Sequence, residues 1–104
     1  MELHTFSSLT ADFLPQYNNS MADADTAFVY FNPKVIEHKR LTPITKEEVK
    51  HAFGTENVTI FTDSQLMQAR LKELNYQNTA LLMMTSGTFD GINIKEFATE
   101  LLTK

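Results

Sequence analysis

The chain has no cysteine and no tryptophan among its 104 residues, and it has only three glycines and three prolines. Without cysteine it can form no disulfide, no thiolate metal site and no thiol nucleophile, and such a composition fits a reducing compartment. A single domain is expected, because two separate cores would each need roughly 100 residues.

Positive charge is also sparse. Nine Lys and Arg residues stand against thirteen Asp and Glu residues, which gives a net charge of −4, and the basic residues are scattered. A surface that follows the phosphates of DNA or RNA is therefore not expected. The longest apolar run, residues 79–84, is far shorter than the ~20 residues that a bilayer requires, and no signal-peptide pattern opens the chain. We expect a cytoplasmic protein with no nucleic-acid and no membrane partner.

Short apolar runs alternate with helical patterns along the chain. Strands are predicted at residues 26–31, 58–61 and 80–84, and the near-continuous apolarity of the first and third is typical of strands buried on both faces of a parallel sheet. The alternation predicts an α/β fold with a mostly parallel sheet flanked by helices. Four helices are predicted. The first begins at about Leu14, with Pro15 in its first turn. The second covers residues 46–53, with a Thr45–Glu48 capping box at its start and Gly54 at its end, and the other two cover residues 63–74 and 93–102.

The predicted helices also carry apolar faces. The helix at 63–74 has a stripe that includes Leu66 and Met67, which we expect to face the core. The helix at 93–102 should pack on the sheet. Methionines other than Met1 are expected to fill gaps in the core.

Two segments leave the organisation of the chain open. Met1–Leu3 looks like the end of a preceding strand, and three strands are fewer than the roughly five or six of a usual sheet, so we expect the domain to be truncated at its N-terminus. The connection from Asn32 to Pro43 is longer than the ~2–6 residues usual between a strand and a helix. It is either a functional loop or a solvated surface excursion.

Ligands of open parallel sheets bind beyond the carboxyl ends of the strands. That edge should carry residues 4–8, 32–33, 62–63 and 85–91. The last segment holds Gly87 and Gly91, and positive φ at both would let an anion approach backbone N–H groups near a helix N-terminus. A plain tight turn is the alternative. The segment matches neither GxGxxG nor GxxxxGK[ST], so it does not indicate a nucleotide site.

The three histidines, His4, His38 and His51, are far apart, and none pairs with a second ligand-type residue at helical spacing. No metal site is therefore predicted. His4 differs from the others only in lying just past a predicted strand end, beside Ser7 and Ser8. No Gly-x-Ser-x-Gly elbow accompanies this trio, which argues against a serine hydrolase.

The order and spacing of several segments along the chain are similar to those of a known enzyme family. These segments are His4-Thr5-Phe6-Ser7-Ser8, Met21-Ala22-Asp23-Ala24-Asp25 leading into Ala27-Phe28-Val29-Tyr30, Asn32-Pro33, and Thr85-Ser86-Gly87-Thr88-Phe89-Asp90-Gly91-Ile92. Over nearly all of its length the chain resembles the C-terminal domain of the Mur ligases. These ATP-dependent enzymes of peptidoglycan synthesis and recycling join an amino acid or peptide to a UDP-N-acetylmuramate carboxylate through an acyl phosphate. The loop from Ser86 and the position of Pro33 look most like the murein-recycling members, with the alanine-adding members as neighbours.

The resemblance implies that residues 1–104 are part of a Rossmann-like domain that closes over a central ATPase domain and helps to bind the incoming amino acid or peptide. Its partners would be the ATPase and muramate-binding domains of the parent chain, which would hold ATP and Mg, with no cofactor in this fragment. No catalytic residue is assigned. The implied substrate-binding residues are His4, Ser7, Ser86, Gly87, Thr88, Phe89, Asp90 and Gly91.

The chain also departs from the family pattern. Thr5 and Ser8 stand where alanine-adding members carry arginines. The Asp-Asp-Tyr-x-His-His-Pro motif, the P-loop and the muramate-binding domain are missing, so we expect this chain alone to be inactive. The alternative is a stand-alone interaction module of flavodoxin-like shape without a ligand.

Overall fold

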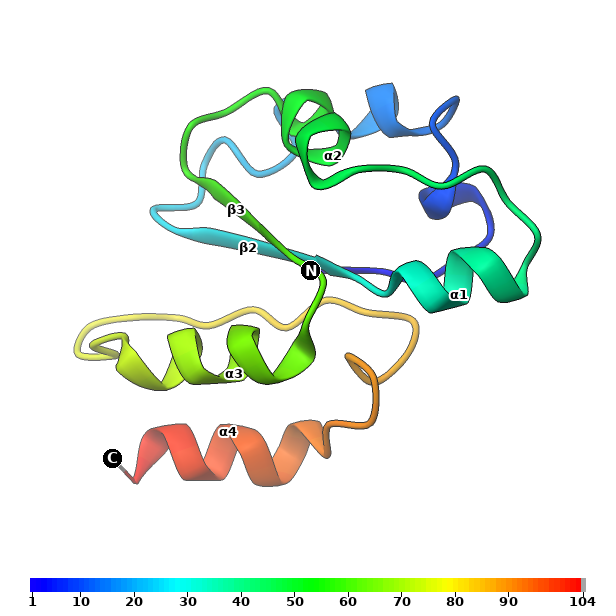
Figure 1. The fold of residues 1–104 in the computed structure, drawn as a ribbon. Coiled ribbons are helices and arrows are strands. Elements are labelled where there is room, and N and C mark those ends of the chain that lie inside the picture. Colours follow the sequence, from blue (N-terminus) through cyan, green and yellow to red (C-terminus); the bar gives the residue numbers. More distant parts are fainter. Residues whose placement is uncertain (104) are drawn as a thin grey trace.

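The computed structural model describes residues 1–103 and arranges them in three layers (Figure 1). The middle layer is a parallel sheet in the order β1 (Glu2–Leu3), β2 (Ala27–Phe31) and β3 (Val58–Phe61). Above it in Figure 1 lie the 3-10 helices η1 (Ser7–Leu9) and η2 (Leu14–Tyr17) and the helix α2 (Lys46–Phe53), with α1 (Pro33–His38) near the end of β2. Below it lie α3 (Ser64–Glu73) and α4 (Ile94–Leu102). The predicted α/β fold with a parallel sheet is confirmed.

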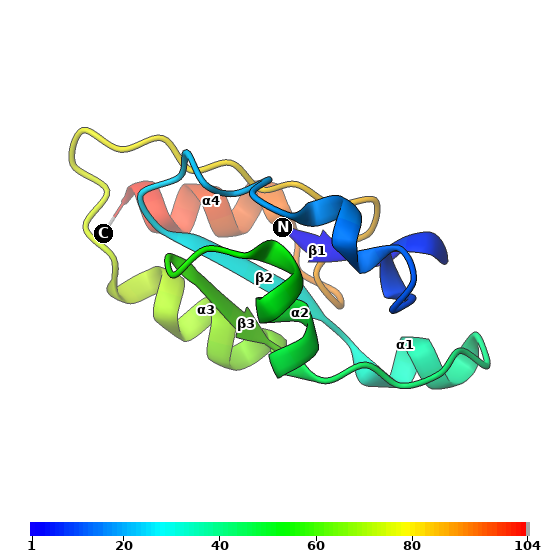
Figure 2. The ribbon, with the colours of Figure 1, turned by 90° about the horizontal axis from the view of Figure 1, so that it is seen from above.

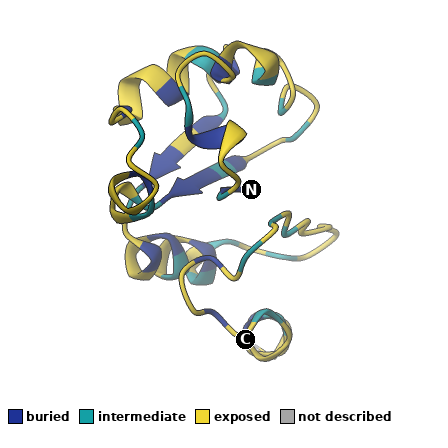
Figure 3. Ribbon diagram, turned by 90° about the vertical axis from the view of Figure 1, so that its right-hand side faces the viewer, coloured by how far each residue is buried: buried dark blue, intermediate teal, exposed yellow. Residues whose placement is uncertain are grey.

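Strand β2 is covered on both faces. Ala27, Val29 and Phe31 belong to the core beneath η1, η2 and α2, whereas Phe28 and Tyr30 belong to the core on the side of α3 and α4. Figure 3 shows that the buried residues concentrate in the strands and in the helix faces turned toward them. Two-sided burial is the reason that this strand reads as a nearly continuous apolar run.

Local capping signals set the helix starts, as predicted for α2. The Thr45 hydroxyl accepts a hydrogen bond from the Glu48 amide, and the Glu48 carboxylate accepts one from the Thr45 amide, both at 3.1 Å. Gly54 ends α2 with a left-handed φ of 72°. The other three α-helices begin after side-chain caps from Asn32, Asp63 and Asn93.

The expectation of an unbroken loop from Asn32 to Pro43 was wrong, because helix α1 forms within it. The Asn32 side chain accepts a hydrogen bond from the Lys34 amide at 2.9 Å, and Pro33 occupies the first turn. An Asn cap followed by Pro is itself a helix-start signal, since Pro has the φ that the first turn needs.

Residues 80–84 do not form the predicted buried strand. The segment is extended and runs beside β1, on the side away from β2 (Figure 2), but only one backbone hydrogen bond joins it to β1, from the Glu2 amide to the Met84 carbonyl at 2.9 Å. Residues 80–84 therefore form no ladder with β1, although β1 itself pairs with β2 on its other side. Leu81, Leu82 and Met84 are exposed, so Met84 does not fill the core as expected.

Two of the helix predictions also need correction. Leu66 of α3, expected on the core-facing stripe, is 61% exposed, whereas its neighbour Met67 is buried. Helix α4 lies farther from the sheet than α3 does (Figure 1) and beside α3 when seen from above (Figure 2), although its Phe97 and Leu101 share a core with Tyr30 of β2. An ion pair of 2.8 Å between Lys72 of α3 and Glu100 of α4 joins the two helices.

The helix predicted from Leu14 is a 3-10 turn of four residues, Leu14–Tyr17, with Pro15 in its first turn as expected. It ends at Asn18, whose backbone is not helical. None of the helices formed by residues 1–103 has the length and apolar character of a bilayer-spanning helix.

Candidate functional site

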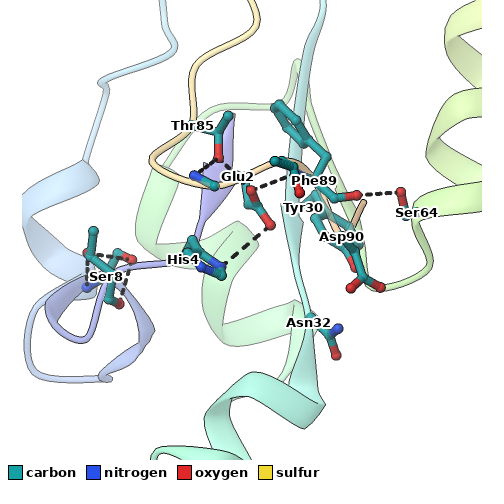
Figure 4. A network of polar contacts seen from close by, with 12 residues as sticks. Glu2, His4, Ser8, Tyr30, Asn32, Ser64, Thr85, Phe89 and Asp90 are labelled. Atoms are coloured by element: carbon teal, nitrogen blue, oxygen red, sulfur yellow. Dashed lines mark hydrogen bonds and ion pairs between the residues drawn. The ribbon is translucent and has the colours of Figure 1, made fainter. Parts of the chain in front are cut away.

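The carboxylate of Glu2 joins the loop after β1 to the loop at residues 85–91 (Figure 4). Its side chain is only 3% exposed. Oxygen Oε1 accepts a hydrogen bond from the Phe89 amide at 2.9 Å and another from the Thr85 hydroxyl. Oxygen Oε2 lies 3.7 Å from Nδ1 of His4. Two segments more than eighty residues apart in the sequence therefore share one buried anchor.

Phe89 is held by side chains at both of its backbone polar groups. Its amide donates to Glu2, and its carbonyl accepts from the Ser64 hydroxyl at 2.7 Å. Phe89, Asp90 and Gly91 have successive left-handed φ values of 52°, 66° and 97°. Such a conformation costs non-glycine residues roughly 1–2 kcal/mol each, so tertiary contacts must stabilise this turn.

Tyr30 and Asp90 connect the turn to the sheet. The Tyr30 hydroxyl donates to Oδ2 of Asp90 over 3.4 Å, and the Tyr30 residue is 1% exposed. Burial, reinforced by the negative charges of Asp90 and Glu2, raises the pKa of Tyr30 to about 12. The hydroxyl therefore keeps its proton at neutral pH and remains a donor to the Asp90 carboxylate.

An open cavity of about 580 Å³ lies at the carboxyl ends of β2 and β3, beside the N-termini of α3 and α4. Its ionisable lining is mostly acidic, with four carboxylates against one lysine, and one of the carboxylates, Glu100, is paired with Lys72. Clefts lined by one sign of charge attract the opposite sign, so this cavity would attract a positively charged group. The charged lining residues are Lys34, Asp63, Asp90, Glu96 and Glu100.

The structure brings together only some of the predicted site residues. His4 lies against Gly87, the Phe89 amide donates to Glu2 next to them, and Asp90 and Gly91 line the cavity. Ser7, Ser86 and Thr88 are exposed and line no part of it. Three further residues of the site, Glu2, Tyr30 and Ser64, were not predicted from the sequence. A carboxylate within an apolar strand, as at Glu2, and polar groups at the ends of strands and helices, as at Tyr30 and Ser64, are signals that could have indicated them.

The expected anion-binding turn is organised differently. Gly91 has positive φ as predicted, but Gly87 does not. The Gly87 amide donates to the Thr85 hydroxyl at 2.8 Å, and the Gly91 amide donates to the Thr88 hydroxyl at 3.0 Å. Together with the bond from Phe89 to Glu2, these contacts satisfy the amides of both glycines and of Phe89 within the chain. The chain's own Glu2 carboxylate takes the place of the expected anion.

The two glycines should therefore respond differently to replacement by Ala. Gly91→Ala has open space for the new methyl but keeps a left-handed backbone, so we expect a loss of about 1–2 kcal/mol in the free energy of unfolding. In Gly87→Ala the added Cβ lies 3.1 Å from the His4 ring and 3.2 Å from Oε1 of Glu2, so these groups must shift. Urea unfolding measures the first effect and the NMR signals of the His4 ring measure the second. Neutral stability in the first variant and unchanged His4 signals in the second would contradict this account.

The resemblance implies ATP and Mg in the parent enzyme, but the residues of this chain do not fit them. No loop combines glycines with a lysine in the phosphate-binding pattern. Within residues 1–103, no group of three or more His, Asp or Glu side chains is arranged to hold a metal ion. Comparison with protein-family models, curated proteins and solved structures finds no match for this chain.

Proposed function

We propose that this chain is the substrate-binding and closure domain of a cytoplasmic Mur ligase, which joins an amino acid or peptide to UDP-N-acetylmuramate in peptidoglycan synthesis or recycling. The member it resembles most is UDP-N-acetylmuramate:L-alanyl-γ-D-glutamyl-meso-diaminopimelate ligase. One observation carries the proposal. The two loops on which the resemblance rests, residues 4–8 and 85–91, meet through Glu2 at the carboxyl edge of the sheet.

The path of the chain supports a Rossmann-like organisation. It passes from β1 to β2 to β3 on the side of the sheet that carries α2, then crosses to the side of α3 and returns beside β1 at residues 80–84. In doubly wound sheets, ligands bind where the strand order reverses in this way. The sheet itself has the order β1-β2-β3, and the corresponding position here lies between β1 and the extended residues 80–84, which form no strand. Both loops of the candidate site begin there.

The acidic cavity supports the substrate class. The incoming amino acid or peptide carries an ammonium group, which Asp63, Asp90 and Glu96 would attract, while Lys34 would attract its carboxylate. ATP and Mg belong, in this proposal, to the central domain of the parent chain. The residues described here would bind and orient the amine that displaces phosphate from the acyl phosphate and gives up a proton.

Sequencing of the full-length gene is the decisive test. We expect a Gly-x-x-x-x-Gly-Lys-Thr motif upstream of Met1 in the same reading frame. We also expect the full-length protein to form ADP when it is given ATP, UDP-N-acetylmuramate and the amino substrate. The isolated chain should show no ATP hydrolysis and should bind ATP more weakly than about 1 mM, because it lacks the phosphate-binding loop. In the full-length protein Asp90→Asn should raise KM for the amino substrate, with exposed Glu47→Gln of α2 as the control.

Two outcomes would reject the assignment. A natural start at Met1 would favour the stand-alone interaction module. Saturable micromolar binding of ATP by the isolated chain, measured by calorimetry, would mean that the nucleotide site does not lie in another domain.

A further inference from the structure

We propose that Glu2 is a positioning residue, which holds the left-handed turn at Phe89–Gly91 in place and thereby sets the Asp90 carboxylate at the cavity. The turn contains only two bonds of its own, from the Ile92 amide to the Thr88 carbonyl and from the Gly91 amide to the Thr88 hydroxyl. Neither bond engages the backbone of Phe89 or the side chain of Asp90. Contacts from outside the turn must therefore fix these two residues.

Three contacts do so, and they come from three different elements (Figure 4). Glu2 of β1 accepts from the Phe89 amide, Ser64 of α3 donates to the Phe89 carbonyl, and Tyr30 of β2 donates to Asp90. Of the three, only Glu2 also binds the Thr85 hydroxyl and approaches His4. Glu2 thus joins the entrance of the 85–91 loop, the turn and the loop after β1.

The burial of Glu2 points to the same role. A carboxylate that is 97% removed from solvent is unfavourable unless hydrogen bonds compensate, whereas an aliphatic side chain in β1 would carry no such cost. The compensation comes from groups of the site, namely the Phe89 amide, the Thr85 hydroxyl and the nearby His4 ring. If the carboxylate were absent, the buried Phe89 amide would lose its acceptor.

The role can be tested on the isolated chain without a ligand. NMR couplings between the amide and Hα protons report φ at Phe89 and Asp90. Glu2→Ala removes the acceptor and should move both residues out of the left-handed region, whereas Glu2→Gln keeps an acceptor oxygen and should preserve it. Leu3→Val is the matched control, because Leu3 lies in the same strand but packs in the opposite core. Left-handed φ values that persist in Glu2→Ala would overturn the proposal.

A second measurement covers the case in which Glu2→Ala does not fold. A neutral amide oxygen is a weaker acceptor than a carboxylate, so Glu2→Gln should accelerate hydrogen exchange of the Phe89 amide about tenfold. The amide of Val29 in β2 should keep its rate and serves as the internal control. Equal rates at Phe89 in the two proteins would overturn the proposal.

The enzymatic consequence rests on the proposed function. The assay uses the full-length protein with UDP-N-acetylmuramate and either L-alanine or L-Ala-γ-D-Glu-meso-diaminopimelate. Glu2→Ala should raise KM for the amino substrate about tenfold with little change in kcat. Glu2→Gln should return KM most of the way to the value of the unmodified protein. A fall in kcat alone would contradict positioning of the amine. A full-length protein without ligase activity would reject the proposed function, while the NMR result would still decide the role of Glu2.

Discussion

Replacing Phe89 with Ala is expected to lower the free energy of unfolding by about 3–5 kcal/mol, the range typical for deletion of a buried aromatic ring. Phe89 is 2% exposed and belongs to the core on the side of α3 and α4, together with Tyr30 and Met67. The ring is held there by a turn that is itself unfavourable for the backbone. Urea unfolding followed by circular dichroism measures the change.

Leu82→Ala is the matched control, since Leu82 is a large apolar residue of the preceding segment. It is 74% exposed, so the expected change stays within about 0.5 kcal/mol. The sequence pattern predicts a larger loss of stability for Leu82→Ala than for Phe89→Ala, because residues 80–84 have the pattern of a buried strand. A larger loss for Leu82→Ala than for Phe89→Ala would mean that this segment is buried and that the described arrangement of the edge is wrong.

Stability should fall when the pH rises through the range in which Tyr30 titrates. Its pKa is raised from 10.0 to about 12 in the folded chain, first by burial and then by the charges of Asp90 and Glu2. Between these pH values the folded state keeps a proton that the unfolded state has lost. The stabilisation is therefore complete below pH 10 and is lost toward pH 12, by an amount on the order of 2 kcal/mol.

Tyr30→Phe provides the test of this pH dependence. The variant keeps the ring but removes the titrating hydroxyl, so its stability should fall less steeply over the same range. Burial also raises the pKa of Tyr17 and Tyr76, but both residues are present in the two proteins and contribute equally to each. Urea unfolding at pH 9 and pH 11.5 gives the two slopes. Identical slopes would show that Tyr30 titrates normally in the folded chain.

Features that depend on a few neighbouring residues could be predicted from the sequence. The capping box of Thr45 and Glu48 closes within four residues, and the left-handed stop at Gly54 needs only the freedom of glycine. The apolar runs at 26–31 and 58–61 carry enough β-branched and aromatic residues to form strands, and their alternation with helices predicts the parallel sheet. The location of the candidate site at the carboxyl edge follows from that topology.

Which groups meet at the carboxyl edge depends on the packing of segments that are far apart in the sequence. Residues 80–84 have the composition of a strand, but a single backbone hydrogen bond joins them to β1, and composition alone does not specify a pairing partner. The role of Glu2 depends on the Phe89 amide, 87 positions away, and no pattern near either residue specifies that bond. The same holds for Gly87, whose lack of a side chain makes room for His4 instead of permitting positive φ. Local hydrogen bonds are determined within a turn of the chain, whereas the partners of buried polar groups depend on how the layers pack.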